Sequence, residues 1–226
     1  MVVRNIVAIG GGGFGRSIGK LMIERYIVSL SSKDNPKVCF IPTASGDNDL
    51  YKLNFYRAFS QLNCITSHVD FFARTDDLEN KILDQDIVYV GGGNTKSMLA
   101  VWKEWNLDNI LRNAYKKGIV MSGVSAGAIC WFNRGITDSY ADSLRIIDCL
   151  GFVEGIACPH FDEEIEREPF VTEMIKKDII DSCICIEGNC AVHITDEKDF
   201  RSVNFGVSKE SFLLSKENNK LLKKLF

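Results

Sequence analysis

The sequence lacks any long hydrophobic segment, because no apolar run approaches the roughly 18 residues that a membrane span needs. Its N-terminal residues also lack the charged start, long apolar centre and small-residue cleavage site of a secretory signal peptide. Basic residues are not in excess, since 27 Lys and Arg face 30 Asp and Glu, for a net charge of −3. We therefore expect a cytoplasmic protein with neither a membrane nor a nucleic acid as partner.

Histidine is scarce in this chain of 226 residues, with three copies, whereas cysteine, with eight, is not. In a reducing compartment these cysteines should remain free, mostly buried thiols. Cys183, Cys185, Cys190 and His193 bring together zinc-type ligands, but Cys-x-Cys alternation is also typical of a strand, so we predict no metal site. With 46% hydrophobic and 25% charged residues, the composition suits a single globular domain over residues 1–226.

Short apolar strands alternate with helical patterns through the first half of the chain. The predicted strands cover residues 5–9, 37–42, 86–90 and 117–121. Such alternation predicts a three-layer α/β sandwich with a mostly parallel central sheet. Glycines and small residues follow the predicted strands, so we expect a site at the carboxyl edge of the sheet. Beyond residue 133 the pattern changes to short strands, ending in a lysine-rich helix.

The run Gly10–Gly15 satisfies the Gly-x-Gly-x-x-Gly fingerprint after a strand, with a helix predicted from about Arg16. This predicts a dinucleotide site, as in a Rossmann-like protein. However, the acidic residue expected at the end of the second strand is missing, because Asp47 lies beyond the following turn and is interpreted with Asn48 as a helix cap. Alternatively, the glycines form a loop at the sheet edge that borders some other site. We expect no cofactor and keep the dinucleotide-binding protein as an alternative.

A strand-turn-helix elbow is predicted where Gly123-Val124-Ser125-Ala126-Gly127 joins an apolar strand to an apolar helix start. A tight Gly-x-Ser-x-Gly turn exposes its serine above the sheet edge, which makes Ser125 the candidate nucleophile. The same residues could form a small-residue turn without chemistry. A second alternative is therefore a non-catalytic protein of the same fold that binds small ligands.

A serine hydroxyl needs a base, and that base needs an acid to fix its tautomer. His160 is the candidate base because it lies in an irregular segment after a proline, whereas His193 alternates as part of a strand and favours a structural role. Glu187, at a predicted strand end, and Asp138, in the loop after the elbow, are the two candidate acids.

An oxyanion hole requires two convergent donors, usually backbone amides. Ala126, directly after the nucleophile, supplies one, and Gly92 in the Gly91–Gly93 turn can supply the other. An α/β-hydrolase would order its triad Ser, Asp, His, which Asp138 and His160 permit. The order Ser, His, Glu fits the chain better, because few parallel strands precede the elbow.

Five segments in this order resemble peptidase family S51, which contains aspartyl dipeptidase and is related to cyanophycinase. They are Val90-Gly91-Gly92-Gly93-Asn94-Thr95, Gly123-Val124-Ser125-Ala126-Gly127-Ala128, Thr137-Asp138, Pro159-His160-Phe161 and Glu187-Gly188-Asn189. The resemblance implies a fold like that of class I glutamine amidotransferases, with serine replacing their cysteine. It also implies a serine peptidase that releases the N-terminal residue of dipeptides or short peptides through an acyl-enzyme.

The resemblance implies a role for each matching residue. Ser125 would be the nucleophile, His160 the base, Glu187 the orienting acid and Asp138 a further acidic residue needed for activity. Gly92 and Ala126 would form the oxyanion hole. Asn94 and Arg167 are the candidate substrate-binding residues; Arg167, in Glu166-Arg167-Glu168, would pair with an aspartyl side chain of the substrate.

Overall fold

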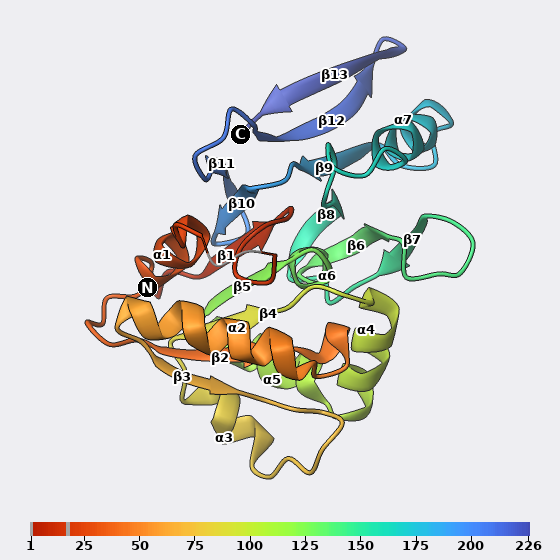
Figure 1. Cartoon of the computed structure of the whole chain (residues 1–226). Helices are drawn as coiled ribbons and strands as arrows, with labels where there is room; N and C mark the ends of the chain where they lie inside the picture. The colour runs from red at the N-terminus through yellow and green to blue at the C-terminus, as the bar shows by residue number, and fades with distance from the viewer. Residues whose placement is uncertain (1, 17–18) are drawn as a thin grey trace.

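The computed structural model describes residues 2–16 and 19–226 and arranges them in two β-sheets, with most of the helices around the lower one in Figure 1. Sheet A has seven strands, of which five are mutually parallel and lie in the order β1 (Asn5–Ile9), β5 (Val120–Val124), β4 (Ile87–Val90), β2 (Lys37–Ile41) and β3 (Ile65–His68). Two antiparallel strands extend it beyond β1, namely β10 (Cys190–Thr195) and then β11 (Asp199–Asn204). The predicted mostly parallel α/β sheet is confirmed for sheet A.

Sheet B is a second, mixed sheet formed by the later part of the chain. Its six strands lie in the order β13 (Lys220–Leu225), β12 (Ser211–Glu217), β9 (Ser182–Ile186), β8 (Val153–Cys158), β6 (Phe132–Thr137) and β7 (Arg145–Asp148). The central strands β6, β8 and β9 are parallel, and the outer strands pair antiparallel. The change of pattern after residue 133 therefore marks the start of another sheet.

Helices cover both faces of sheet A because successive side chains of a strand point to opposite faces. Phe40 packs with Phe55 on one face, whereas its neighbour Cys39 belongs to the core with Trp102 on the other. The longest helix described has 11 residues, and none within residues 2–16 and 19–226 is long and apolar enough to cross a membrane. The helices of the first face are α1 (Met22–Val28) and α2 (Asp49–Phe59), and those of the second are α3 (Leu78–Leu83), α4 (Thr95–Glu104) and α5 (Leu107–Lys116). The short α6 (Ala126–Ile129) joins the same core as Trp102, and α7 (Arg167–Lys176) packs on sheet B.

The parallel strands of sheet A end level with one another. Ile9 pairs with Val124, Val90 pairs with Gly123, and Ile41 pairs with Val90. The segments that follow these strands, including the glycine loop after β1 and the turn after β4, therefore leave the sheet at the same edge. This is the edge at which the alternation of strands and helices predicts a site.

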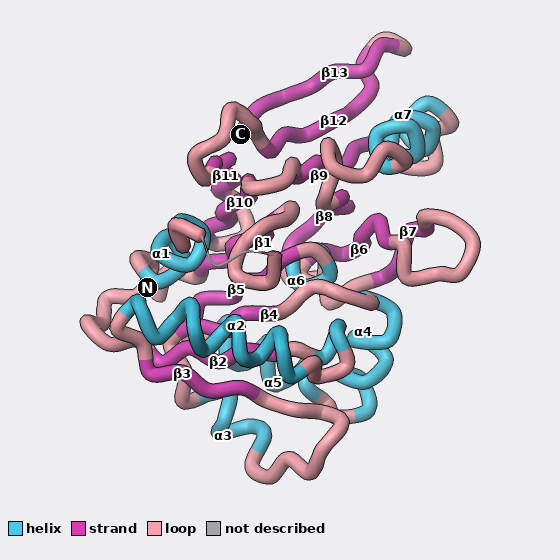
Figure 2. The backbone as a smooth tube through the Cα atoms, in the orientation of Figure 1, coloured by secondary structure: helices cyan, strands magenta, loops and turns pink. Residues whose placement is uncertain are grey.

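The C-terminal segment corrects one expectation. Residues 220–225 form the strand β13 and not a helix, and Figure 2 shows β12 and β13 as two neighbouring strands at the top of the view. Asn218 and Asn219 both have positive φ, at 50° and 62°, so they form the two-residue turn that favours a hairpin. The Asn-Asn pair was the signal in the sequence.

The start of the first helix is a second correction. Arg16 lies in a turn, with its amide donating to the Gly13 carbonyl at 3.0 Å, and α1 begins at Met22. Ser17 and Ile18, which fall within the predicted helix, lie outside the described residues. The glycine run therefore does not lead directly into a helix N-terminus, as a dinucleotide fingerprint requires.

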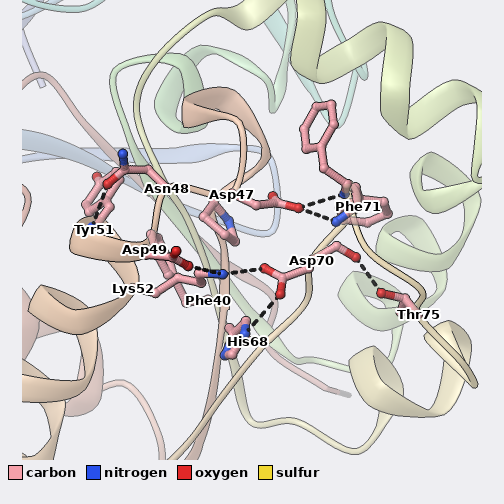
Figure 3. Close-up of polar contacts among 12 residues, drawn as sticks. Phe40, Asp47, Asn48, Asp49, Tyr51, Lys52, His68, Asp70, Phe71 and Thr75 are labelled. Atoms are coloured by element: carbon pink, nitrogen blue, oxygen red, sulfur yellow. Dashed lines mark hydrogen bonds and ion pairs between the residues drawn. The ribbon is translucent and has the colours of Figure 1, made fainter.

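Asp47 and Asn48, the two residues before α2, have different hydrogen-bond partners (Figure 3). Asn48 caps the helix as predicted, because its Oδ1 accepts from the Tyr51 amide at 2.9 Å. Asp47, which the sequence suggested for the same cap, instead accepts from the amides of Phe71 and Phe72. These contacts fix the N-terminal end of α2 against the segment after β3.

His193 on β10 yields a prediction about the pH dependence of stability. It is 7% exposed, its Nδ1 lies 2.8 Å from the Tyr26 hydroxyl, and its Nε2 lies 2.9 Å from Asn5 Oδ1. Burial, followed by repulsion from Arg201, lowers the pKa of His193. The unfolded chain therefore binds a proton there more readily, so stability should decrease as the pH falls below the unfolded value of about 6.5.

Urea unfolding at pH 7.5 and pH 5.5 measures this contribution. The wild-type protein should lose stability at pH 5.5, and His193→Gln should lose less, because it removes the group whose protonation the fold opposes. An equal loss in both proteins would show that other groups cause the acid sensitivity.

Candidate active site

Ser125 occupies the turn between β5 and α6 in a strained backbone conformation. Its φ is 58° and its ψ is −112°, a region that non-glycine residues adopt only at a cost of about 1–3 kcal/mol. The Ser125 amide donates to the Ile9 carbonyl at 3.0 Å, and the Ser125 carbonyl accepts from the Ala128 amide at 2.9 Å. The strand-turn-helix elbow predicted from the sequence is thus present, anchored to the end of β1.

The two glycines of the elbow are required by close backbone contacts. A Cβ on Gly123 would lie 2.3 Å from the Gly127 carbonyl oxygen, and one on Gly127 would lie 2.3 Å from the Val90 carbonyl oxygen. Real Cβ atoms do not approach backbone this closely, so only glycine lets β5 turn back beside the end of β4. The contact of Gly123 with Gly127 is local, whereas the contact of Gly127 with Val90 joins the elbow to the end of β4.

Ser125 and His160 line the same cavity, of about 210 Å³. His160 follows β8, has a φ of 52°, and donates its amide to the Gly10 carbonyl at 3.1 Å. Segments distant in the sequence therefore meet at the edge of sheet A. The complete lining consists of Gly12, Gly15, Arg16, Tyr51, Gly92, Gly93, Val124, Ser125 and His160.

The carboxylate that contacts His160 is that of Glu163. Its Oε2 lies 2.7 Å from His160 Nδ1, and the two side chains are 19% and 8% exposed. The turn after His160 produces this contact, because the amides of Glu163 and Glu164 both donate to the His160 carbonyl, at 3.0 and 3.1 Å. Glu163 was not among the predicted residues, although its position three residues after the histidine was an available signal.

The glycine loop after β1 packs directly on this pair. A Cβ on Gly11 would lie 2.5 Å from Glu163 Oε2 and 2.7 Å from His160 Nδ1. Arg16 of the same loop, 52% exposed, contacts Glu163 Oε1 at 2.7 Å and His160 Nδ1 at 3.2 Å. The glycine run was interpreted either as a dinucleotide site or as a loop that borders another site. Its position beside His160 and Glu163 agrees with the second interpretation.

The side chain of Glu187, the predicted acid, does not contact His160. Its Oε2 accepts from the Glu210 amide at 3.0 Å, and it lines a separate cavity with Lys209 and Lys223. Its backbone does reach the site region, since a Cβ on Gly10 would lie 2.3 Å from the Glu187 carbonyl oxygen. The contact that the structure gives to His160 is thus that of Glu163 and not that of Glu187.

Asp138 and Asn94 both lie outside the cavity lining. Asp138 is exposed directly after β6. The Asn94 side chain caps α4, because Oδ1 accepts from the Ser97 amide at 2.8 Å, and its Nδ2 donates to the Ser139 carbonyl at 3.5 Å. Neither side chain contacts His160 or Ser125 in the described structure.

Arg167, the predicted substrate-binding residue, is 2% exposed at the start of α7. Its Nε donates to Glu164 Oε2 at 2.6 Å and its Nη1 to the Ile136 carbonyl at 3.1 Å. The guanidinium is thus engaged within the fold, away from the cavity that Ser125 lines. The cation that lines this cavity is that of Arg16.

The two predicted oxyanion donors flank the elbow. Ala126 begins α6, where a helical amide has no intrahelical acceptor. A Cβ on Gly92 would lie 3.3 Å from the Ser125 Cβ, so the β4 turn adjoins the nucleophile. The Gly92 amide donates to the Tyr51 hydroxyl at 3.3 Å, and Tyr51 is a cavity residue that the sequence analysis did not identify.

An α/β fold with a strained serine elbow and a carboxylate-bound histidine at one sheet edge defines a serine-type hydrolase. A comparison with protein families agrees and is more specific, since the model of peptidase family S51 matches residues 6–201. The chain belongs to this family and is a peptidase.

Two relatives with peptidase names are similar to this chain. The chain is 42% identical over 203 residues to the uncharacterized peptidase YgaJ of Bacillus subtilis, covering 89% of this chain and 88% of the relative. It is 27% identical over 150 residues to the uncharacterized peptidase Lmo0363 of Listeria monocytogenes, covering 61% of this chain and 72% of the relative.

Two solved structures share the fold at low identity. A putative peptidase E protein from Listeria monocytogenes EGD-e superposes with a TM-score of 0.69 at 20% identity, over 90% of this chain and 100% of that one. A peptidase from an acI-B1 Actinobacterium gives a TM-score of 0.71 at 14% identity, over 99% of this chain and 94% of that one.

Replacing Arg167 tests whether it supports the fold or binds substrate. Arg167→Gln should lower the free energy of unfolding by about 1–3 kcal/mol, because it leaves the Ile136 carbonyl and Glu164 without their donor. Arg145→Gln is the control, since Arg145 forms a half-exposed pair with Asp142 and its loss should change stability by less than about 0.5 kcal/mol. If stability were unchanged and KM rose for acidic dipeptides but not for others, Arg167 would be a substrate-binding residue.

Proposed function

We propose that this chain is a serine peptidase that hydrolyses dipeptides or short peptides after the N-terminal residue, aspartyl peptides among them. The observation that carries the proposal is the shared cavity of Ser125 and His160, with His160 Nδ1 bound to a carboxylate at 2.7 Å. A cavity of about 210 Å³ is smaller than the roughly 300–1,000 Å³ of sites for drug-sized ligands, which favours a small substrate. Arg16 in its lining pairs with Glu163 at 2.7 Å and, with its five N–H donors, has further donors for an acidic side chain.

In the proposed reaction His160 Nε2 removes the proton of Ser125 Oγ as the oxygen attacks the peptide carbonyl. Glu163 on Nδ1 keeps the proton on that nitrogen, leaves Nε2 free as the base, and stabilises the imidazolium that forms. His160 then donates its proton to the leaving amine, which gives an acyl-enzyme ester on Ser125. Water, activated by the same nitrogen, hydrolyses the ester and restores the serine.

The proposal extends to the type of fold. A parallel sheet whose nucleophile follows a central strand in a sharp turn is the arrangement expected of a class I glutamine amidotransferase-like protein, with serine in place of cysteine. The position of β5 between β1 and β4 supports this view.

Replacing the nucleophile tests the proposed activity. Ser125→Ala should lower kcat by about 10⁶-fold on the dipeptides that the wild-type protein cleaves, without unfolding it. Ser122→Ala is the matched control, because this serine lies on β5, three residues before the nucleophile, and its hydroxyl donates to the Val88 carbonyl at 2.8 Å. Amino acids released from panels of Asp-X and X-Ala dipeptides provide the measurement. Wild-type rates in Ser125→Ala would refute the proposal.

The choice of acid can be tested separately. Glu163→Gln should lower kcat by about 10³–10⁴-fold with little change in KM, because the glutamine no longer fixes the imidazole tautomer. Glu187→Gln should remain close to wild type, since that carboxylate caps the Glu210 amide. Nitrogen chemical shifts of His160 should show the Nδ1–H tautomer in the wild type and in Glu187→Gln, and a mixture in Glu163→Gln. The reverse pattern would make Glu187 the acid, as the family resemblance implies.

A further inference from the structure

Tyr51 is a cavity residue for which the proposed mechanism has no role so far. It lies in the first turn of α2, where its amide is held by the Asn48 cap at 2.9 Å (Figure 3). The cap brings its side chain to the carboxyl edge of sheet A. There it lines the same cavity as Ser125, His160 and Gly92.

The Tyr51 ring is fixed on several sides. The ring centroids of Phe14 and Phe40 lie 5.4 and 5.0 Å from its own. Glycines border two ring edges, because a Cβ on Gly15 would lie 2.7 Å from Cε2 and one on Gly91 would lie 3.0 Å from Cε1. The hydroxyl is therefore held in one position, as a group that acts on a transition state must be.

The Tyr51 hydroxyl accepts a hydrogen bond from the Gly92 amide at 3.3 Å. A phenol can accept and donate at once, so its own proton remains available to another acceptor in the cavity. Burial raises the pKa of Tyr51 to about 12, which keeps that proton in place at neutral pH. Gly92 adjoins Ser125, with 3.3 Å between a Gly92 Cβ and the Ser125 Cβ.

We propose that the Tyr51 hydroxyl is the second oxyanion donor, so that Gly92 acts through Tyr51 and not directly on the substrate. The Gly92 amide orients and polarises the phenol, and the phenol O–H donates to the oxygen that becomes negative when Ser125 attacks. Ala126 supplies the other donor. No covalent bond of Tyr51 changes, and its proton stays on the phenol. The proposal rests on the proposed peptidase function.

Tyr51→Phe tests the hydroxyl and leaves the ring in place. It should lower kcat by about 10²–10³-fold with KM within about threefold, because the lost hydrogen bond forms only in the transition state. Tyr56→Phe is the matched control, since Tyr56 is on the same helix and its hydroxyl contacts His68 Nδ1 at 2.5 Å, outside the cavity lining. This control should keep wild-type kcat.

Binding of a peptide aldehyde provides a second measurement. The aldehyde adds to Ser125 Oγ as a hemiacetal whose oxygen occupies the oxyanion position, so Tyr51→Phe should weaken its binding by the same factor as kcat. Binding of the product amino acid should not change. Wild-type kcat and aldehyde affinity in Tyr51→Phe would refute the proposal. A rise in kcat would also refute it and indicate that the hydroxyl blocks the Gly92 amide.

The two proposals fail in different ways. If the wild-type protein cleaves no dipeptide, or if Ser125→Ala is fully active, the peptidase assignment to Ser125 fails. If the wild type is active, Ser125→Ala is inactive and Tyr51→Phe is unchanged, the assignment of Tyr51 alone fails.

Discussion

The strained backbone at Ser125 is the constraint on which the rest of the site depends. A serine keeps a φ of 58° and a ψ of −112° only where its surroundings leave no alternative. Its amide is bound to the carbonyl of Ile9, and α6 packs against the end of β4 through the Gly127 contact with Val90. The three central strands β1, β5 and β4 must therefore all be in register before the nucleophile has its position.

The same dependence extends to the histidine. His160 belongs to the connection between β8 and α7, yet its amide is bound to the Gly10 carbonyl at the end of β1. The Gly11 backbone lies against the pair of His160 and Glu163, with no room for a side chain. The loop after β1 thus joins the nucleophile of sheet A to the base contributed by the segment after β8.

This arrangement explains the glycine run at the start of the chain. Gly11 leaves space for the histidine and its carboxylate, and the fingerprint glycines Gly10 and Gly15 leave space for the Glu187 carbonyl and for Tyr51. The sequence matches a dinucleotide fingerprint because a dinucleotide-binding loop and this loop both require other groups to approach the backbone closely after the first strand. The two structures differ in the residues that follow the glycines. In this chain Arg16 lies in a turn beside Glu163, and α1 begins only at Met22.

The strands of sheet A and the nucleophile turn could be predicted from short-range features of the sequence. Short apolar runs that alternate with helical patterns predicted the parallel strands, and the spacing of Gly123, Ser125 and Gly127 predicted the elbow, because both patterns lie within continuous stretches of the chain. The spacing of Glu163, three residues after His160, is a local feature of the sequence, but only the tertiary structure showed that the Glu187 side chain lies away from the histidine. Glu187 follows a strand of sheet B that directs its side chain to the Glu210 amide, whereas a turn after His160 folds Glu163 back onto the ring. Tyr51 reaches Gly92 for the same reason: the contact joins α2 to the β4 turn, and no local pattern encodes a distance between them.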